Sequence, residues 1–229
     1  MADRYKVPVG VRFFRWWCRP VFRLIFRLLG PVKITGWENV PKSGAYLITM
    51  NHVSLFDPPF LLAFWPVAPD AVGAADVWKR KGQATLVSWY GGIPIHRGEY
   101  ERQVLDALVH VLRSGRPLLI APEGARSHTP GMKQAHPGVA YLVEKTNVPV
   151  VPVGIVGTTD DYFNRGIHGK RPLIEMHIGK PFYLPPLEQL GGTRREARQR
   201  GADLIMQHIA AQLPPLYRGV YGQPAVDSA

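Results

Sequence analysis

The residues best suited to chemistry are a histidine and an aspartate with four residues between them, His52 and Asp57, at the end of an apolar run. Imidazole titrates near neutral pH, so a histidine held in one tautomer by a carboxylate can take a proton from a hydroxyl group. Because Asp57 precedes Pro58, the chain should bend here and let the two side chains meet. The pair predicts a general base with its orienting acid. A structural interpretation is also open, in which Asp57 caps a helix through residues 60–64.

Further polar side chains follow other predicted strands at comparable positions. In a parallel sheet, ligands bind beyond the carboxyl ends of the strands, so these side chains should gather beside His52. Two guanidinium groups at one place would hold a phosphate through charge-assisted, forked hydrogen bonds, although each arginine alone could equally be a solvated surface ion pair. The residues are Arg97, after the run 93–96, and Glu123, Gly124 and Arg126, after the run 117–121.

The elements that would position these residues alternate between strand and helix. Short β-type runs are mostly continuous in apolar character, as in a sheet covered on both faces, and helical periodicity lies between them. Thr193 and Glu196 form a capping box that opens a further helix. This order predicts a single α/β domain with a mostly parallel sheet flanked by helices. The predicted strands are 32–37, 45–50, 93–96, 117–121, 148–156 and 173–178, and helices are predicted at 99–113, 139–145 and from 194.

Residues 1–30 form a basic amphipathic helical segment that holds more than half of the formal net charge of +11. Five arginines recur at spacings of three and four, which predicts one helical stripe, and apolar and aromatic residues fill the remainder. Pro20 should kink the segment or divide it into two short helices. Such a segment is typical of the headgroup layer of an anionic membrane, but a core-packing helix with a solvated arginine face would look similar. The predicted membrane-binding residues are Arg12, Arg15, Trp16, Trp17, Arg19, Arg23 and Arg27.

Composition argues against several other classes of protein. No stretch of about 20 residues in the basic segment lacks an arginine, and no cleavage site follows an apolar centre, so neither a transmembrane span nor a signal peptide is predicted. A single cysteine, Cys18, excludes an intramolecular disulfide, and the histidines lack the spacing of a metal site. No nucleic-acid-binding motif is present. We expect helices at 1–30, one domain at 31–213 and a loosely attached tail at 214–229.

Four segments in order resemble the motifs of the glycerolipid acyltransferases, in particular the 1-acylglycerol-3-phosphate (lysophosphatidic acid) acyltransferases. The resemblance implies that His52 and Asp57 are the catalytic dyad and that Arg97, Glu123, Gly124 and Arg126 bind the substrate phosphate. Ala125 departs from the family pattern, since a threonine usually stands at that position. Residues 51–57 are similar to the motif NHxxxxD, 92–97 to a motif ending in an arginine, 122–127 to PEGTRS, and 148–153 to a proline-containing strand.

The resemblance implies transfer of a fatty acyl group from an acyl thioester to the free hydroxyl of a lysophospholipid. The favoured acceptor is 1-acylglycerol-3-phosphate, the donor is acyl-coenzyme A or acyl carrier protein, and no cofactor or metal is expected. The expected location is peripheral, on the cytoplasmic face of the cell membrane, with an anionic membrane surface as partner. Transfer to glycerol-3-phosphate or another lysophospholipid, an ester or thioester hydrolase with the same dyad, and a non-catalytic binding module remain open.

Overall fold

A seven-stranded sheet forms the centre of the protein, whose computed structural model describes residues 5–96 and 102–222. The strands follow the order β1-β7-β6-β2-β5-β3-β4, and all neighbours pair in parallel except β6 and β7. The predicted α/β class with a mostly parallel sheet is therefore confirmed. The strands are β1 (Val32–Thr35), β2 (Leu47–Met50), β3 (Asp70–Ala74), β4 (Ile93–Ile95), β5 (Leu118–Ile120), β6 (Val150–Val156) and β7 (Ile174–Ile178).

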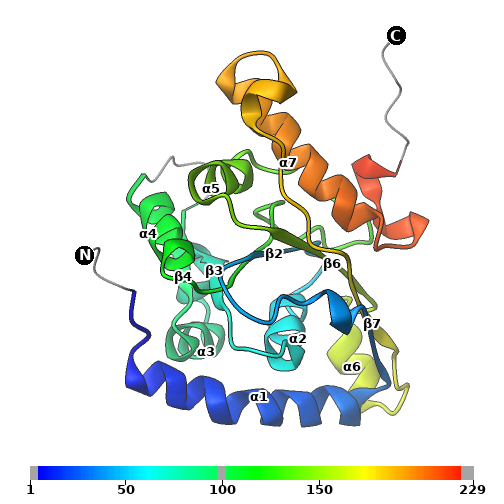
Figure 1. Cartoon of the computed structure of the whole chain (residues 1–229). Coiled ribbons are helices and arrows are strands. Elements are labelled where there is room, and N and C mark those ends of the chain that lie inside the picture. The colour runs from blue at the N-terminus through cyan, green and yellow to red at the C-terminus, as the bar shows by residue number, and fades with distance from the viewer. Residues whose placement is uncertain (1–4, 97–101, 223–229) are drawn as a thin grey trace.

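Helices cover both faces of the sheet (Figure 1). In the view of Figure 1, α4, α5 and α7 lie above the sheet, and α1, α2, α3 and α6 lie below it. Each layer has its own apolar core against one face of the sheet. The helices are α1 (Val9–Leu29), α2 (Asp57–Phe64), α3 (Gln83–Tyr90), α4 (Arg102–Arg113), α5 (Gly138–Thr146), α6 (Tyr162–Ile167) and α7 (Arg194–Ala210), with short 3₁₀ turns η1 (Trp37–Asn39), η2 (Ala75–Lys79), η3 (Leu187–Leu190), η4 (Pro215–Tyr217) and η5 (Gly219–Tyr221).

Strand β2 lies in the middle of the sheet, between β6 and β5, and all four of its residues are buried. Continuous burial explains its apolar sequence, because both of its faces pack against helices. The side chain of Asn51, the residue after β2, continues the pairing with β6. Its Nδ2 donates to the Ile155 carbonyl at 2.9 Å, and its Oδ1 accepts from the Ile155 amide at 2.7 Å. The end of β2, from which His52 follows, is thereby tied to β6.

Helix α1 runs without a break through 21 residues, so the expected division at Pro20 is wrong. Pro20 removes one intrahelical hydrogen bond. The helix continues because Phe14, Cys18 and Phe26, which lie on both sides of the proline, are buried in the same apolar core between α1 and the sheet. In the part of the chain that the structure describes, no helix is long and apolar enough to span a membrane.

The arginines at the centre of α1 face the protein, so the expectation of one exposed arginine stripe is wrong. Arg15 is 3% exposed, and its Nη2 lies 2.9 Å from Asp70 Oδ1. Arg19 and Arg23 donate to backbone carbonyls at the C-terminal end of α2, where carbonyl groups have no partner within the helix. Cations at that end also complement the helix dipole. The carbonyls belong to Leu62 (3.1 Å from Arg19), Ala63 (2.6 Å from Arg23) and Trp65, which Arg19 also reaches.

Apolar side chains occupy the outer face of α1 instead. Phe13 is 61% exposed, Trp16 74%, Leu24 59% and Leu28 67%. Trp17 is also exposed, and so are the two outermost arginines of the predicted stripe, Arg12 and Arg27. Contiguous large apolar side chains are unusual on an exposed helix face, and this face of α1 is therefore a candidate contact surface.

The segment after α7 packs onto the domain through residue 222, so the expected loose tail is wrong for residues 214–222. Tyr217 is buried, and its hydroxyl accepts from the Gly157 amide at 3.0 Å. The hydroxyl of Tyr221 donates to Asp203 at 2.7 Å. These aromatic anchors explain why a stretch without helical periodicity is nevertheless ordered. Residues 223–229 lie outside the described part of the chain.

Candidate active site

His52 and Asp57 meet across a short loop between β2 and α2. His52 Nδ1 lies 2.9 Å from Asp57 Oδ2, which confirms the predicted bend before Pro58. Asp57 is the first residue of α2 and is fully buried, whereas the His52 side chain is 17% exposed and lines a cavity. With Nδ1 donating to the carboxylate, Nε2 is the basic nitrogen that can accept a proton from a substrate.

The Asp57 carboxylate is held by four donors. Besides His52, its Oδ2 accepts from the backbone amides of Val53 at 2.7 Å and Ser54 at 2.8 Å. The hydroxyl of Thr158 donates to Oδ1. Charge-assisted bonds of this number fix the carboxylate in place and compensate for its burial. Thr158 is a member of the site that the sequence analysis missed. The Ser54 hydroxyl accepts from the Phe56 amide at 3.1 Å, which is a local turn contact.

Glu123 supports the site from behind the cavity wall. Its Oε1 accepts from the His52 amide at 2.8 Å, and its Oε2 accepts from the Lys133 amide at 2.7 Å. The side chain is 3% exposed and does not line the cavity. The expectation that Glu123 binds the phosphate directly is therefore corrected: both of its oxygens are used to position backbone. Burial raises the pKa of Glu123 to about 7, against the opposing effect of the two amide donors.

Gly124 allows the chain to turn closely around a histidine. Its φ of +65° lies in the left-handed region, and a Cβ at this position would come within 2.7 Å of His136 Cδ2. A side chain would be strained and would also clash. Gly124 lines the cavity next to the dyad loop, to which this turn is joined by the hydrogen bond from the Ser127 amide to the His52 carbonyl at 2.8 Å.

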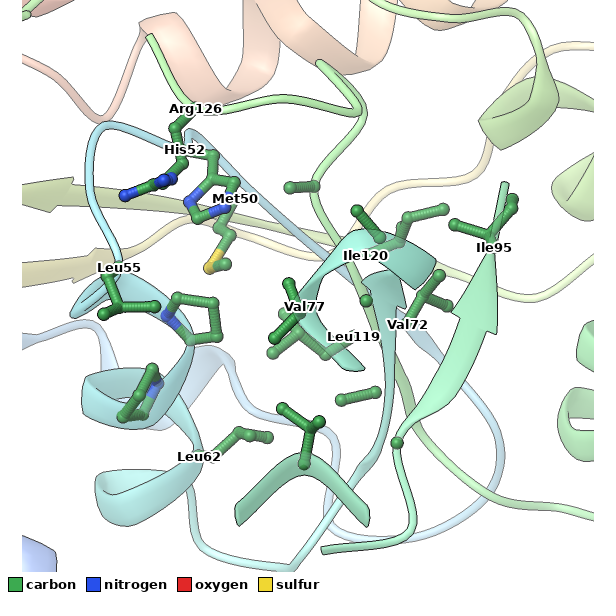
Figure 2. A pocket seen from close by; sticks show the side chains of 18 of the residues that line it. Met50, His52, Leu55, Leu62, Val72, Val77, Ile95, Leu119, Ile120 and Arg126 are labelled. Atoms are coloured by element: carbon green, nitrogen blue, oxygen red, sulfur yellow. The ribbon is translucent and has the colours of Figure 1, made fainter. Parts of the chain in front are cut away.

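Arg126 lies beside His52 at one end of the cavity, as Figure 2 shows. Its Nη1 is 3.7 Å from Oδ1 of Asp160, an exposed carboxylate that also contacts His128 Nδ1 at 2.8 Å. The structure thus brings together the dyad and one of the two arginines predicted for phosphate binding. The other arginine, Arg97, lies outside the described residues.

A cavity of about 1030 Å³ opens at the dyad. Figure 2 shows its apolar part extending from His52 toward Leu62 on α2, with Val72 of β3 and Val77 of η2 on the facing wall. Sites for drug-sized ligands measure about 300–1,000 Å³, so the space accommodates a long apolar chain. On α2 and directly after it, Phe60, Phe64 and Trp65 are core residues, whereas Leu62 lines the cavity. Within the described chain, no group of side chains is arranged as a metal site requires.

Residues 31–156 match the protein-family model described as Acyltransferase, which covers more than half of the chain. The chain belongs to the acyltransferase family. A lyso-ornithine lipid O-acyltransferase from Pseudomonas aeruginosa is 30% identical to this acyltransferase in an alignment of 210 positions that covers 84% of this chain and 76% of the relative. A 1-acyl-sn-glycerol-3-phosphate acyltransferase from Bacillus subtilis is 23% identical over 82% of this chain and 94% of its own. The resemblance to the glycerolipid acyltransferases is confirmed.

The same fold occurs in a solved relative. The crystal structure of the 1-acyl-sn-glycerophosphate (LPA) acyltransferase PlsC from Thermotoga maritima aligns with a TM-score of 0.58 and 22% sequence identity, covering 88% of this chain and 86% of that one. In the acyltransferase described here, no serine hydroxyl or cysteine thiol of the described residues hydrogen-bonds to the His52 ring. The arrangement therefore offers a candidate base, His52, with a carboxylate that orients its ring.

Proposed function

We propose that this acyltransferase moves a fatty acyl group from an acyl thioester to the free hydroxyl of 1-acylglycerol-3-phosphate, giving phosphatidic acid, at the surface of a membrane. The observation that carries the proposal is the His52–Asp57 dyad at the end of an apolar cavity, with Arg126 beside the histidine. A base, a cation and an apolar space are what a phosphorylated lipid alcohol and a fatty thioester together require.

The proposed reaction is a direct transfer. His52 Nε2 takes the proton of the acceptor hydroxyl as its oxygen attacks the thioester carbonyl carbon. The tetrahedral intermediate then collapses, the carbon–sulfur bond breaks, and the thiolate takes the proton from the imidazolium. The Asp57 carboxylate holds the histidine tautomer and stabilises the imidazolium, as the acid does in hydrolase triads. Acid–base help of this kind contributes about 10²–10⁴ in rate, and the step consumes no cofactor.

The proposed membrane contact is the outer apolar face of α1. Trp16 and Phe13 with Leu24 and Leu28 present aromatic and aliphatic groups along one side of a single helix, a pattern typical of helices that lie in the interface. Because the inner arginines are engaged by the protein, attachment rests on apolar burial more than on charge. A peripheral position on the cytoplasmic face of the cell membrane is part of the proposal, because an acceptor that resides in the bilayer is best met there.

The test is an acyl-transfer assay with product detection by mass, in which palmitoyl-coenzyme A and palmitoyl carrier protein are each paired with a panel of lysolipids. His52→Ala should lose transfer by at least about 10²-fold while it still sediments with vesicles. His168→Ala is the matched control, because His168 is exposed on the far end of α6. Unchanged turnover of His52→Ala would reject the dyad. Release of free fatty acid at the same rate with and without lysolipid would identify a hydrolase instead.

Asp160, the neighbour of Arg126, favours a second class of acceptor, one whose head group carries both a positive and a negative charge. Asp160 places a half-exposed carboxylate 3.7 Å from the guanidinium, so the site offers both signs of charge. Ornithine carries an amino and a carboxyl group, which match such a pair better than a phosphate does. A lyso-ornithine lipid is therefore the second candidate. Asp160→Asn should improve the use of lysophosphatidic acid if phosphate is the native group, and should impair the use of the ornithine lipid if that lipid is the native acceptor.

A further inference from the structure

The cavity at the dyad does not end on the lower face of the sheet. Besides the apolar part lined by α2, β3 and η2, its lining includes Gly138 and Tyr141 of α5 and Arg195 and Arg198 of α7. Helices α5 and α7 lie on the upper face, opposite to α1 and α2 (Figure 1). The lining of the cavity therefore continues past the carboxyl edge of the strands, and His52 lies at the end of its apolar part. We name that apolar part the lower lobe (lined by α2, β3 and η2) and the remainder the upper lobe (lined by α5 and α7).

The arginines that line the upper lobe lie where the dipole of α7 is unfavourable for positive charge. Arg194, Arg195 and Arg198 lie in the first two turns of α7, where the helix dipole favours anions and disfavours cations. One carboxylate, Glu144, pairs with both Arg194 and Arg198, the latter at 2.8 Å. Arg195 is exposed and forms no ion pair with the residues that the structure describes. Positive charge is therefore left uncompensated at the rim of a cavity, where an anionic ligand would balance it.

The two cationic places of the cavity suit different ligands. Arg126 lies beside His52, so it fits a phosphate that is only a few bonds from the reacting hydroxyl. Arg195 and Arg198 lie in another layer of the fold, so they fit a phosphate that a long linker separates from the reacting carbon. A thioester carried on phosphopantetheine has that form, with a phosphate at one end of the arm and the acyl sulfur at the other. The upper lobe also lies on the opposite side of the sheet from α1 (Figure 1). A ligand dissolved in water can therefore reach it from the side that faces away from α1.

We propose that the upper lobe binds the phosphopantetheine arm of the acyl donor, with the phosphate at Arg195 and Arg198, the thioester at His52 and the fatty chain in the lower lobe. This assignment rests on the proposed acyl transfer from a thioester. Coenzyme A and acyl carrier protein share the phosphopantetheine arm, so either can supply the ligand. Arg198 is already ordered by Glu144 and by the ring of Tyr141, 4.9 Å from its guanidinium carbon, which leaves Arg195 as the adaptable contact.

The test is Arg195→Glu, measured with three donors: palmitoyl-coenzyme A, palmitoyl carrier protein and palmitoyl-pantetheine, which lacks phosphate. A glutamate in the first turn of α7 suits the helix dipole, so the variant should fold. At low salt, the KM for at least one phosphate-bearing donor should rise about 5–20-fold, and the rise should shrink at high salt. The KM for palmitoyl-pantetheine and that for the acceptor should each change by less than about 2-fold. The affected donor identifies the source of the arm.

Arg200→Glu is the matched control, because Arg200 carries the same charge on the same helix but does not line the cavity. An equal effect of Arg200→Glu, an equal rise for palmitoyl-pantetheine, or a change confined to the acceptor KM would overturn the assignment. Equilibrium binding of palmitoyl-coenzyme A and of the carrier protein to wild type and Arg195→Glu is measured in parallel. If wild type transfers no acyl group, the proposed function fails, and binding alone decides the role of the upper lobe. Transfer by wild type with unchanged donor constants in Arg195→Glu rejects only the upper-lobe assignment.

Discussion

Replacing Asp57 by asparagine removes the charge of the dyad and keeps its shape. The amide oxygen can take the place of Oδ2 and accept from the amides of Val53 and Ser54 and from His52, while the amide nitrogen faces the Thr158 hydroxyl, which can accept as well as donate. The histidine tautomer is therefore preserved. We expect the free energy of unfolding to fall by about 1–3 kcal/mol, because the buried Thr158 hydroxyl loses the carboxylate oxygen to which it donates.

The loss of activity follows from the charge alone. Nδ1 and Oδ2 are 2.9 Å apart, so the centres of an imidazolium and a carboxylate are separated by about 4 Å. At an effective dielectric constant of about 20, that pair is worth about 4 kcal/mol, or roughly 10³ in rate. The amide oxygen returns part of this stabilisation. We expect kcat to fall about 10²–10³-fold, with the KM values of both substrates nearly unchanged, because the imidazolium forms only during the reaction.

The assay is steady-state acyl transfer with product detection by mass, beside a denaturant titration of each protein. Asp161→Asn is the matched control: this aspartate is exposed, flanks α6 and lies outside the cavity lining, so its kcat should be unaffected. If Asp57→Asn kept more than about a tenth of wild-type kcat, the carboxylate would contribute less than about 1.4 kcal/mol to the transition state. The reasoning from charge would then be refuted, and Asp57 would be an orienting group only.

Three further predictions concern the supports of the site. Below pH 4.5 the stability contributed by protonated Glu123 is fully present, and it is lost as pH rises through its folded pKa of about 7. Denaturant titrations from pH 4.5 to pH 7 should therefore show the free energy of unfolding of wild type falling by about 3 kcal/mol relative to that of Glu123→Gln. The same pH dependence in both proteins would contradict this prediction. Leu62→Trp narrows the lower lobe, so kcat/KM should drop about 10-fold or more for palmitoyl donors and little for decanoyl donors; equal losses would show that the chain lies elsewhere. Trp16→Ser should weaken vesicle binding by about 1.5–3 kcal/mol, and wild-type binding should largely persist at about 0.5 M salt; release by salt would assign the attachment to charge.

The end of β2 and the bend after it were predictable because their signals are local. The apolar run, the histidine and the aspartate before proline all lie within a dozen residues. Strand β3, by contrast, was missed. Its sequence, from Asp70 to Ala74, has a single β-branched residue, and its order comes from pairing with β4 and β5 on either side. Thr158 was missed for a related reason, since its only signal is a contact with a residue 101 positions earlier in the chain.

The arginines of α1 show a different limit of sequence reasoning. Their spacing correctly predicts a helix with one basic side, but periodicity relates side chains to each other and does not tell which side meets the protein. The inner arginines bind partners that lie 40 or more residues later in the chain, namely Asp70 and the last carbonyls of α2. Apolar residues take part of the inner side as usual, since Phe14, Cys18 and Phe26 are buried there. That the arginines lie beside them is visible only once the carbonyls that need donors are in place.

The place of α1 at the start of the fold has a consequence for biosynthesis. Its inner face is completed only when distant segments are made: the hydroxyl of Tyr162 reaches the carbonyl of Phe26 across a sequence separation of 136. At about 5–20 residues per second, translation leaves α1 without that neighbour for roughly 7–27 s. During this interval both its aromatic side and its arginines are open on the ribosome-bound chain. On the proposed membrane contact of α1, the nascent segment would offer an anionic bilayer more positive charge than the folded protein does, and delivery to the membrane would precede folding.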